Sequence, residues 1–209
     1  RTYRFVEAAP WYPFGYGLTY SRFHYENFSA AAVEGGIDVR VEVENGSSRG
    51  GDEIVEFYVR YEGDAFEKPH HKLVGFKRGN VPGHEIAEFH YHIPEKALMS
   101  VMENGKSVLL DGAYTLFAGG CQPDERSVEL TGEAPLAIAF TVADGKIQIG
   151  KEAECAPYVY PDQGDYAAHI TKRKKFSLDT PFSMLYDNPV SRAVLMETMP
   201  MIFSEQNPY

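Results

Sequence analysis

The sequence has 209 residues, of which 44% are hydrophobic and 13% aromatic, which is ample material for a packed core. Charged residues make up 24%, an ordinary share for a folded protein, so the composition excludes wholesale disorder. The formal net charge of −10 repels phosphate backbones and anionic lipid, which makes nucleic acid and membrane surfaces poor candidate partners. No apolar run approaches the roughly 18 residues of a spanning helix.

The first residues and the two cysteines indicate how the chain is produced and in which compartment it lies. The chain opens with Arg1 and shows no apolar signal region, so we expect a fragment or a processed chain. Cys121 and Cys155 are too few for a secreted disulfide scaffold, and their spacing does not suit zinc. Two reduced thiols are the favoured interpretation, and one bridge between them is the alternative. We therefore expect a cytoplasmic protein rather than a secreted one.

Residues 37–149 show the period-two alternation of β-strands with one face in water. Strands are predicted at residues 37–43, 53–61, 72–77, 84–93, 108–110, 114–118, 127–131 and 138–142. In the second of these, one face carries Val55, Phe57 and Val59. The opposite face carries Glu56, Tyr58 and Arg60. Short strands at such intervals, without long helical patterns between them, favour an antiparallel β-sandwich. Residues 111–114 (DGAY) suit the tyrosine corner of such folds.

The alternating pattern of the sequence ends at Ile149. Residues 150–175 contain prolines, tyrosines and a basic run without a clear period, which indicates an extended segment or a linker. Beyond Asp179, Thr180-Pro181 and Asn188-Pro189 are typical of helix starts, and apolar residues recur at helical spacing up to Pro200. We interpret this Met-containing helix as a docking tail.

Residues 12–20 (YPFGYGLTY) resemble the Y-P-F-G-x-G-L-S-Y-T signature of family 3 glycoside hydrolases, with Thr19 in place of the usual Ser. The motif positions are Pro13, Phe14, Gly15, Gly17 and Leu18. Further elements follow in family order: residues 39–45 and 50–59 are similar to V-x-V-x-N…G-x-E-V-V-Q-L-Y-V, and residues 68–76 to R-P-x-K-x-L-x-G-F. Residues 82–85 stand where P-G-E is usual, and 112–114 with 119–120 match a later G-x-Y…G. The ordered set covers about residues 10–132, which makes coincidence a poor explanation.

The resemblance implies a division of the chain. Residues 1–20 would end the α/β-sandwich domain of a parent enzyme, and residues 21–149 would form an immunoglobulin/fibronectin type III-like antiparallel sandwich. Residues 150–209 would form an extended linker and a short helical C-terminal tail. In the family the nucleophilic Asp lies in a barrel domain and the acid/base usually lies in the α/β-sandwich domain. Neither motif occurs here, so no catalytic residue, cofactor or metal is assigned.

Three residues are candidates for sugar-facing or interdomain contacts. Phe66 and His70 belong to the loop 62–71, which in some relatives reaches toward the active site, although a packing contact with neighbouring domains is favoured. Trp11 lies beside the domain-closing motif and is interpreted as an interdomain plug rather than a sugar platform. His90 and His92 share a strand face, but without a third placed ligand a metal there is disfavoured.

The leading functional hypothesis is a non-catalytic part of a β-glucosidase-like enzyme that buttresses the barrel and α/β-sandwich domains, with carbohydrate as a further candidate partner. Its contacts would come from Trp11, Tyr12, Phe14 and the tail helix. The alternatives are a carbohydrate-binding module, for which Tyr58 and Tyr61 would begin an aromatic row, and a plain interaction sandwich. The glycoside cleaved, the domain order of the parent and the oligomeric state stay open.

Overall fold

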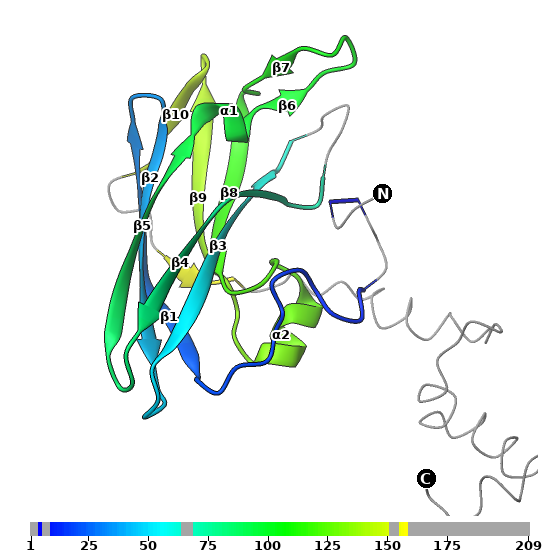
Figure 1. The fold of residues 1–209 in the computed structure, drawn as a ribbon. Coiled ribbons are helices and arrows are strands. Elements are labelled where there is room, and N and C mark those ends of the chain that lie inside the picture. Colours follow the sequence, from blue (N-terminus) through cyan, green and yellow to red (C-terminus); the bar gives the residue numbers. More distant parts are fainter. Residues whose placement is uncertain (1–3, 6–8, 64–68, 151–154, 159–209) are drawn as a thin grey trace, which may run out of the picture. The chain divides into compact units, whose positions relative to one another are not determined.

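The computed structural model describes residues 4–5, 9–63, 69–150 and 155–158 (Figure 1). These residues belong to one compact unit of the chain, Arg1–Tyr160. The predicted tail helix lies outside the described residues. Neither helix among the described residues has the length and apolar character needed to cross a bilayer.

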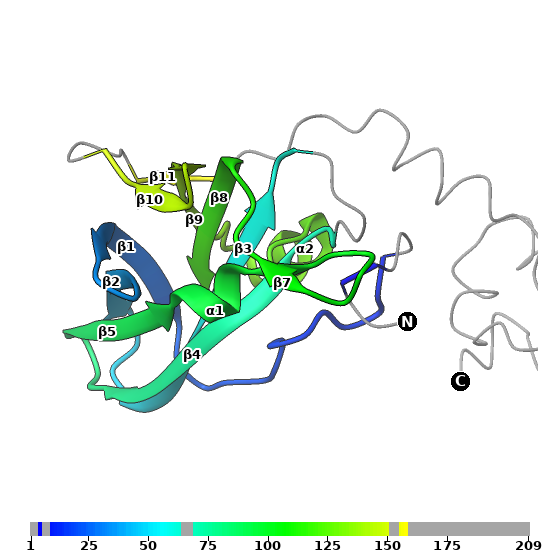
Figure 2. The same ribbon diagram turned by 90° about the horizontal axis from the view of Figure 1, so that it is seen from above.

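Two antiparallel sheets make up the fold (Figures 1 and 2). The three-stranded sheet runs in the order β1 (Phe23–Val33), β2 (Gly36–Asn45), β5 (Ile86–Pro94). The six-stranded sheet runs in the order β10 (Lys146–Gln148), β9 (Leu136–Ala143), β8 (Gly112–Gly119), β3 (Gly51–Tyr61), β4 (Lys72–Val81), and β11 (Ala156–Pro157) also pairs with β9. A separate hairpin joins β6 (Ser100–Val101) to β7 (Ser107–Val108), and the helices are α1 (Glu95–Leu98) and α2 (Glu125–Thr131). The predicted antiparallel β-sandwich is confirmed.

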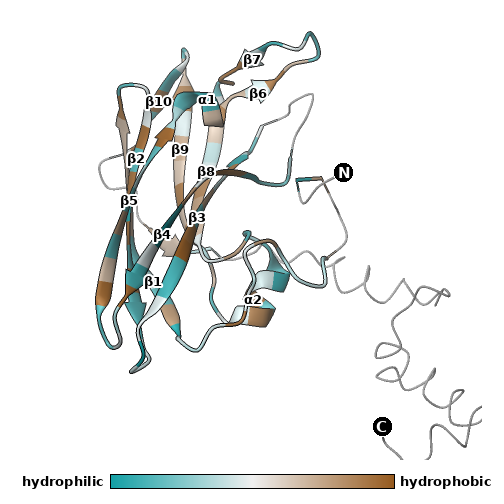
Figure 3. Ribbon diagram, in the orientation of Figure 1, coloured by the Kyte–Doolittle hydropathy of each residue, from teal (hydrophilic) through white to brown (hydrophobic). Residues whose placement is uncertain are grey.

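The core lies between the inner faces of the two sheets. Phe57 of β3 is fully buried and stacks on Phe28 of β1 and on Tyr91 of β5, with ring centroids 6.4 and 5.5 Å away. Alternate valines of β2 point inward with it, as the sequence pattern predicts. Figure 3 shows hydrophobic and hydrophilic bands along the strands of both sheets. The period-two pattern therefore marks the inner faces correctly.

The predicted tyrosine corner is present. The Tyr114 hydroxyl donates a hydrogen bond of 2.7 Å to the carbonyl oxygen of Leu110, four residues earlier. The Tyr114 ring stacks on Phe140 at 5.0 Å and is 2% exposed, so burial raises the pKa of its hydroxyl to about 12. The corner ties the start of β8 to the loop that precedes it.

One predicted strand is wrong, because residues 127–131 lie in helix α2. The Asp124 carboxylate caps the start of the helix by accepting a hydrogen bond of 2.7 Å from the Ser127 amide. At the other end Gly132 adopts a φ of 77°, and its amide donates to the carbonyl of Val128. Two well-formed caps of this kind favour a helical turn over a short alternating pattern. The predicted strand at 108–110 is also displaced, since β7 ends at Val108.

Candidate interdomain site

Residues 13–16, here called the docking segment, lie against the loop that follows β8 and beside α2 (Figure 1). The Gln122 amide donates a hydrogen bond of 2.9 Å to the Phe14 carbonyl, and the Phe14 amide donates one of 3.2 Å to Gln122 Oε1. Pro13 is buried, and the Tyr16 amide donates to its carbonyl at 3.1 Å. Backbone groups of the docking segment therefore bond to Gln122, and the Phe14 side chain is 53% exposed.

The two glycines of the motif have different surroundings. Gly15 has a φ of +85°, and a Cβ added to it would lie 2.7 Å from Glu56 Oε2 and 2.7 Å from the Gly120 carbonyl oxygen. A Cβ on Gly17 would meet nothing within 4 Å. Leu18 is 95% exposed. The first half of the motif is thus explained by contacts within this chain, and nothing in the described structure explains Gly17 or Leu18.

We expect Gly15→Ala to destabilise the chain by about 1–3 kcal/mol, because alanine would be strained at positive φ and would clash with the Gly120 backbone. Gly17→Ala is the matched control and is expected to change stability by less than about 0.5 kcal/mol. Urea unfolding followed by tyrosine and tryptophan fluorescence measures both. Equal effects of the two substitutions would show that the docking segment is not held as described.

Glu56, on the outer face of β3, lies beneath the docking segment, and Glu53 of the same strand lies near enough to raise its pKa. Glu56 is 5% exposed, and its Oε2 accepts a hydrogen bond of 2.6 Å from the Tyr58 hydroxyl. Glu53 accepts one of 2.5 Å from the Tyr25 hydroxyl. Burial raises the pKa of Glu56 to about 7 against the lowering effect of Tyr58, and burial also raises the pKa of Glu53. The alternation of this strand places Glu56 on the face predicted to lie in water, and that prediction is wrong at Glu56.

The neighbouring ionisable groups supply no positive charge to this pair. Burial lowers the pKa of His71 to about 4, so its ring is neutral at pH 7. Burial and the nearby Glu56 raise the pKa of the Cys121 thiol to about 12. Asp124 accepts a hydrogen bond from the Gln122 side chain. Within the described ranges, Glu53 and Glu56 form no ion pair with Lys, Arg or His.

Aromatic side chains of the N-terminal segment are exposed. The exposed fractions are 53% for Trp11, 71% for Tyr12, 53% for Phe14 and 89% for Tyr20. Two further apolar residues, Ile54 at 45% and Phe76 at 60%, are exposed on the outer face of β3 and β4. Phe76 lies opposite Glu56 in the β3–β4 register, so it shares the face over which Gly15 lies. We call these six residues the apolar surface.

The three predicted contact residues have different outcomes. Trp11 is exposed and belongs to the apolar surface. His70 is exposed, and its amide donates a hydrogen bond of 2.8 Å to the Arg4 carbonyl. Phe66 lies outside the described residues. Sequence reasoning did not identify Glu56, Gln122 or Phe76, although the Phe76 side chain does fall on the alternation of β4.

The aromatic row considered for a carbohydrate-binding module is absent from the described part of the chain. Tyr58 is 1% exposed, and its ring meets His71 edge-on at 5.4 Å. Tyr61 lies on the opposite face of β3, where it contacts Tyr114 at 4.9 Å. Because the two rings neither share a face nor reach solvent together, they cannot form a flat sugar platform.

The histidines and cysteines considered as metal ligands or as a disulfide have the following contacts. His92 Nδ1 lies 2.7 Å from Asp38, whereas His90 contacts Glu88, so the two rings engage different carboxylates. No group of three His, Cys, Asp or Glu side chains among the described residues is arranged to hold a metal ion. Cys121 is a free thiol, as is Cys155.

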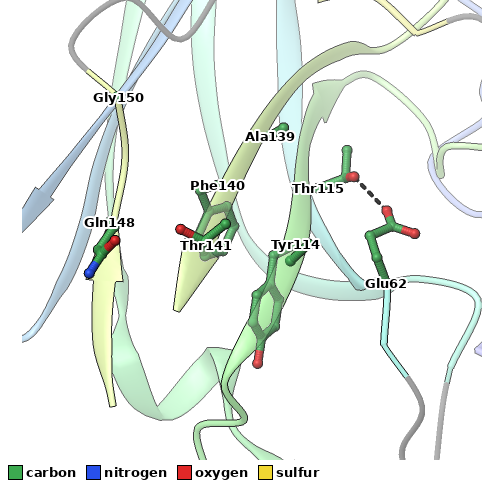
Figure 4. A pocket seen from close by; sticks show the side chains of 9 residues that line it. Glu62, Tyr114, Thr115, Ala139, Phe140, Thr141, Gln148 and Gly150 are labelled. Atoms are coloured by element: carbon green, nitrogen blue, oxygen red, sulfur yellow. Dashed lines mark hydrogen bonds between the residues drawn. The ribbon is translucent and has the colours of Figure 1, made fainter. Parts of the chain in front are cut away.

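An open cavity of about 370 Å³ lies over β8, β9 and β10 (Figure 4). Glu62 at its rim accepts hydrogen bonds from Arg60 Nε at 2.8 Å and from the Thr115 hydroxyl at 2.5 Å. Tyr114 and Phe140 contribute to the lining, but their side chains are buried in the core. The cavity therefore offers neither an exposed ring face nor a carboxylate without partners to a sugar.

Comparison with known proteins places the fold and the motif in context. Residues 53–122 match the family model described as the fibronectin type III-like domain. A β-xylosidase of Formosa agariphila is 33% identical over 62% of this chain and 19% of its own length. Beta-glucosidase BoGH3A of Bacteroides ovatus is 31% identical over 47% of this chain and 14% of its own length.

Solved structures agree with this placement. Beta-glucosidase 3B of Thermotoga neapolitana, in complex with α-D-glucose, superposes with a TM-score of 0.55 at 26% identity. The match covers 68% of this chain and 19% of that one. The chain thus spans about a fifth of the length of the relatives it matches.

Proposed function

We propose that this chain, which carries the fibronectin type III-like domain found in family 3 glycoside hydrolases, is a non-catalytic part of such an enzyme and buttresses its catalytic domains. The proposal rests on two properties of the N-terminal segment. Its backbone is bonded to Gln122, while the rings of Trp11, Tyr12 and Phe14 remain exposed. The segment is thus bonded to the sandwich through its backbone and presents aromatic rings to solvent.

The number of large exposed side chains in the apolar surface supports a protein partner. Monomeric proteins commonly expose single apolar residues, but a group of large side chains on one region marks an interaction site. Covering one large apolar side chain contributes about 1.5–3 kcal/mol, so a few of them suffice for a stable domain contact. The partner we propose is the barrel and α/β-sandwich domains of a β-glucosidase-like parent. His70, exposed at the end of loop 62–71, is available for the finer role of contacting a sugar near the active site.

The carboxylate pair of β3 does not supply the chemistry of a glycosidase. A retaining enzyme needs two carboxyl groups about 5–5.5 Å apart with the scissile bond between them. Glu56 is 5% exposed beneath the docking segment, and a Cβ on Gly120 would lie 2.7 Å from Glu53 Oε1. No sugar ring fits between groups packed so closely. We therefore assign the hydrolytic step to the parent's other domains.

The direct test is hydrolysis of a panel of aryl β-glycosides. The chain alone is expected to be inactive, and mixing it with the separately made barrel and α/β-sandwich domains is expected to raise their activity or stability. Hydrolysis by this chain alone would overturn the proposal. Unchanged activity and melting temperature of the catalytic domains after saturating addition of the chain would overturn the buttressing role.

Within that test we expect Trp11→Ala to weaken association with the catalytic domains by about 10- to 100-fold, since exposed Trp residues at interfaces often contribute about 2 kcal/mol or more. Isothermal titration calorimetry measures the dissociation constant. Ile86→Ala is the control, because Ile86 on β5 is 54% exposed, as Trp11 is at 53%, but lies on the other sheet. Unchanged affinity in Trp11→Ala would place the interface elsewhere, and an equal loss in both variants would show that the effect is not specific to the apolar surface.

A further inference from the structure

The Glu56 carboxyl lies where two distant segments of the chain close over β3. Gly15 approaches it from the docking segment, and the Gly120 carbonyl and Cys121 Cα approach Gly15 from the loop after β8. The carboxyl accepts the Tyr58 hydroxyl bond, and no cation of the described residues forms an ion pair with it. A carboxyl in such surroundings favours its protonated form, because the ionised form would lose water without gaining a counter-charge.

The groups that face Glu56 from each packed element strengthen this preference. Its own strand contributes Glu53 and Tyr58, β1 contributes Tyr25, the start of β4 is preceded by His71, and the loop before α2 contributes Cys121 and Asp124. None of these is positively charged at neutral pH, since burial keeps His71 neutral. Glu53 is acidic and raises the pKa of Glu56 further.

We propose that the docking segment packs over the Glu56 carboxyl while that carboxyl is protonated, and that ionisation of Glu56 releases the segment. Ionisation places a negative charge beneath Gly15, where water must enter to solvate it. Water enters most readily by displacing residues 13–16, which are held by the two hydrogen bonds to Gln122. The direction in which Trp11 and Tyr12 present their rings then depends on pH.

The sign of the effect follows from linkage. With the segment docked, the pKa of Glu56 is about 7, against an ordinary value of 4.5. Below the ordinary value both states are protonated and docking is strongest. Docking weakens as pH rises toward 7 and is weakest above it. The two values set a ceiling of about 300-fold on the change in the docking equilibrium. We expect about 10- to 100-fold, because Tyr58 remains beside Glu56 after release.

The proposal concerns this chain alone, so its test needs no partner domain and is separate from the mixing experiment. NMR on the full 209-residue chain follows the side-chain carboxyl carbon of Glu56, the Gln122 amide and the indole of Trp11, the one tryptophan of the sequence, between pH 4 and 8.5. We expect the three signals to titrate together with a midpoint near 7. A carboxyl midpoint near 4.5, or amide and indole signals that titrate separately from the carboxyl, would overturn the proposal.

Glu56→Gln provides the matched variant, because glutamine has the same shape and stays neutral. In this variant the Gln122 amide and the Trp11 indole are expected to keep their low-pH positions throughout the titration. Glu44→Gln, at an exposed position of β2, is expected to titrate as the wild type does. Persistence of the wild-type titration in Glu56→Gln would assign the effect to another group. Should that variant not fold, coincidence of the three wild-type midpoints still decides.

Discussion

Replacement of Phe57 by alanine is expected to lower the free energy of unfolding by about 3–5 kcal/mol, the range for large-to-small changes of a buried aromatic residue. Phe57 is 0% exposed and lies between the rings of Phe28 and Tyr91, so its removal leaves a cavity bounded by both sheets. Because both rings belong to the three-stranded sheet, the change weakens the contact between the layers. Urea unfolding measures the effect, and the melting temperature should fall by about 10 °C or more.

Phe76→Ala is the control for this prediction, because the same side chain is removed from a neighbouring strand. Phe76 is 60% exposed on the outer face, so its loss should change the stability of the isolated chain by less than about 0.5 kcal/mol. If the two substitutions were equally harmful, the assignment of inner and outer faces in β3 and β4 would be incorrect. In the presence of the catalytic domains Phe76→Ala should weaken association, since Phe76 belongs to the apolar surface.

Replacement of Asn45 by alanine is expected to lower the free energy of unfolding by about 2–4 kcal/mol, because it removes three hydrogen bonds to backbone groups, among them one to the carbonyl of buried Val81. Asn45 is 0% exposed at the end of β2. Its Nδ2 donates to the carbonyls of Arg49 and Val81 at 2.9 and 3.1 Å, and its Oδ1 accepts from the Ser47 amide at 2.9 Å. One side chain thus joins β2, the following loop and the end of β4.

Asparagine is required at this position for its two donors and one acceptor. Asn45→Asp should be at least as harmful as Asn45→Ala at pH 7, because a carboxylate would face two carbonyl oxygens. Asn80→Ala is the matched control, since Asn80 is exposed and its side chain bonds Asp52 on the surface at 3.0 Å. Thermal unfolding of the three variants at pH 7 ranks them. An Asn45→Asp variant as stable as the wild type would refute the described hydrogen bonds.

The inner faces of the strands could be predicted from the sequence because the interior between the sheets is uniformly apolar. Alternation identified Phe57 and the β2 valines without any knowledge of their partners. The tyrosine corner was predictable for a similar reason. Its Leu110–Tyr114 hydrogen bond spans four residues, so all its parts lie in one short segment.

The outer face of β3 could not be predicted in this way. Glu56 and Tyr58 alternate with apolar residues, as solvated positions do, yet both are buried. Gly15 of the docking segment lies over Glu56, and the segment is bonded to Gln122 by a hydrogen bond spanning 108 positions. The His71 ring contacts Tyr58. Local pattern carries no information about such distant coverage. The pattern that residues 50–59 resemble has Gln at the position of Glu56. Because this position is buried, the change from a neutral amide to an ionisable carboxyl affects the electrostatics of the site.

Helix α2 shows a different kind of failure, because its signal was present in the sequence. Asp124 before the segment and Gly132 after it are typical of a helix start and a helix end. The intervening residues also alternate between polar and apolar, which is typical of a strand, yet the segment is helical. Cap residues deserve more weight than alternation in a window of seven residues.

The hydrogen bonds between Phe14 and Gln122 also have a consequence for biosynthesis. A ribosome releases Phe14 long before Gln122, since 108 positions separate them, and closure of so long a loop is slow. Throughout that interval the aromatic N-terminal segment has no sandwich to bind. A nascent chain stalled before residue 122 would therefore depend on chaperones to keep these exposed rings from aggregating.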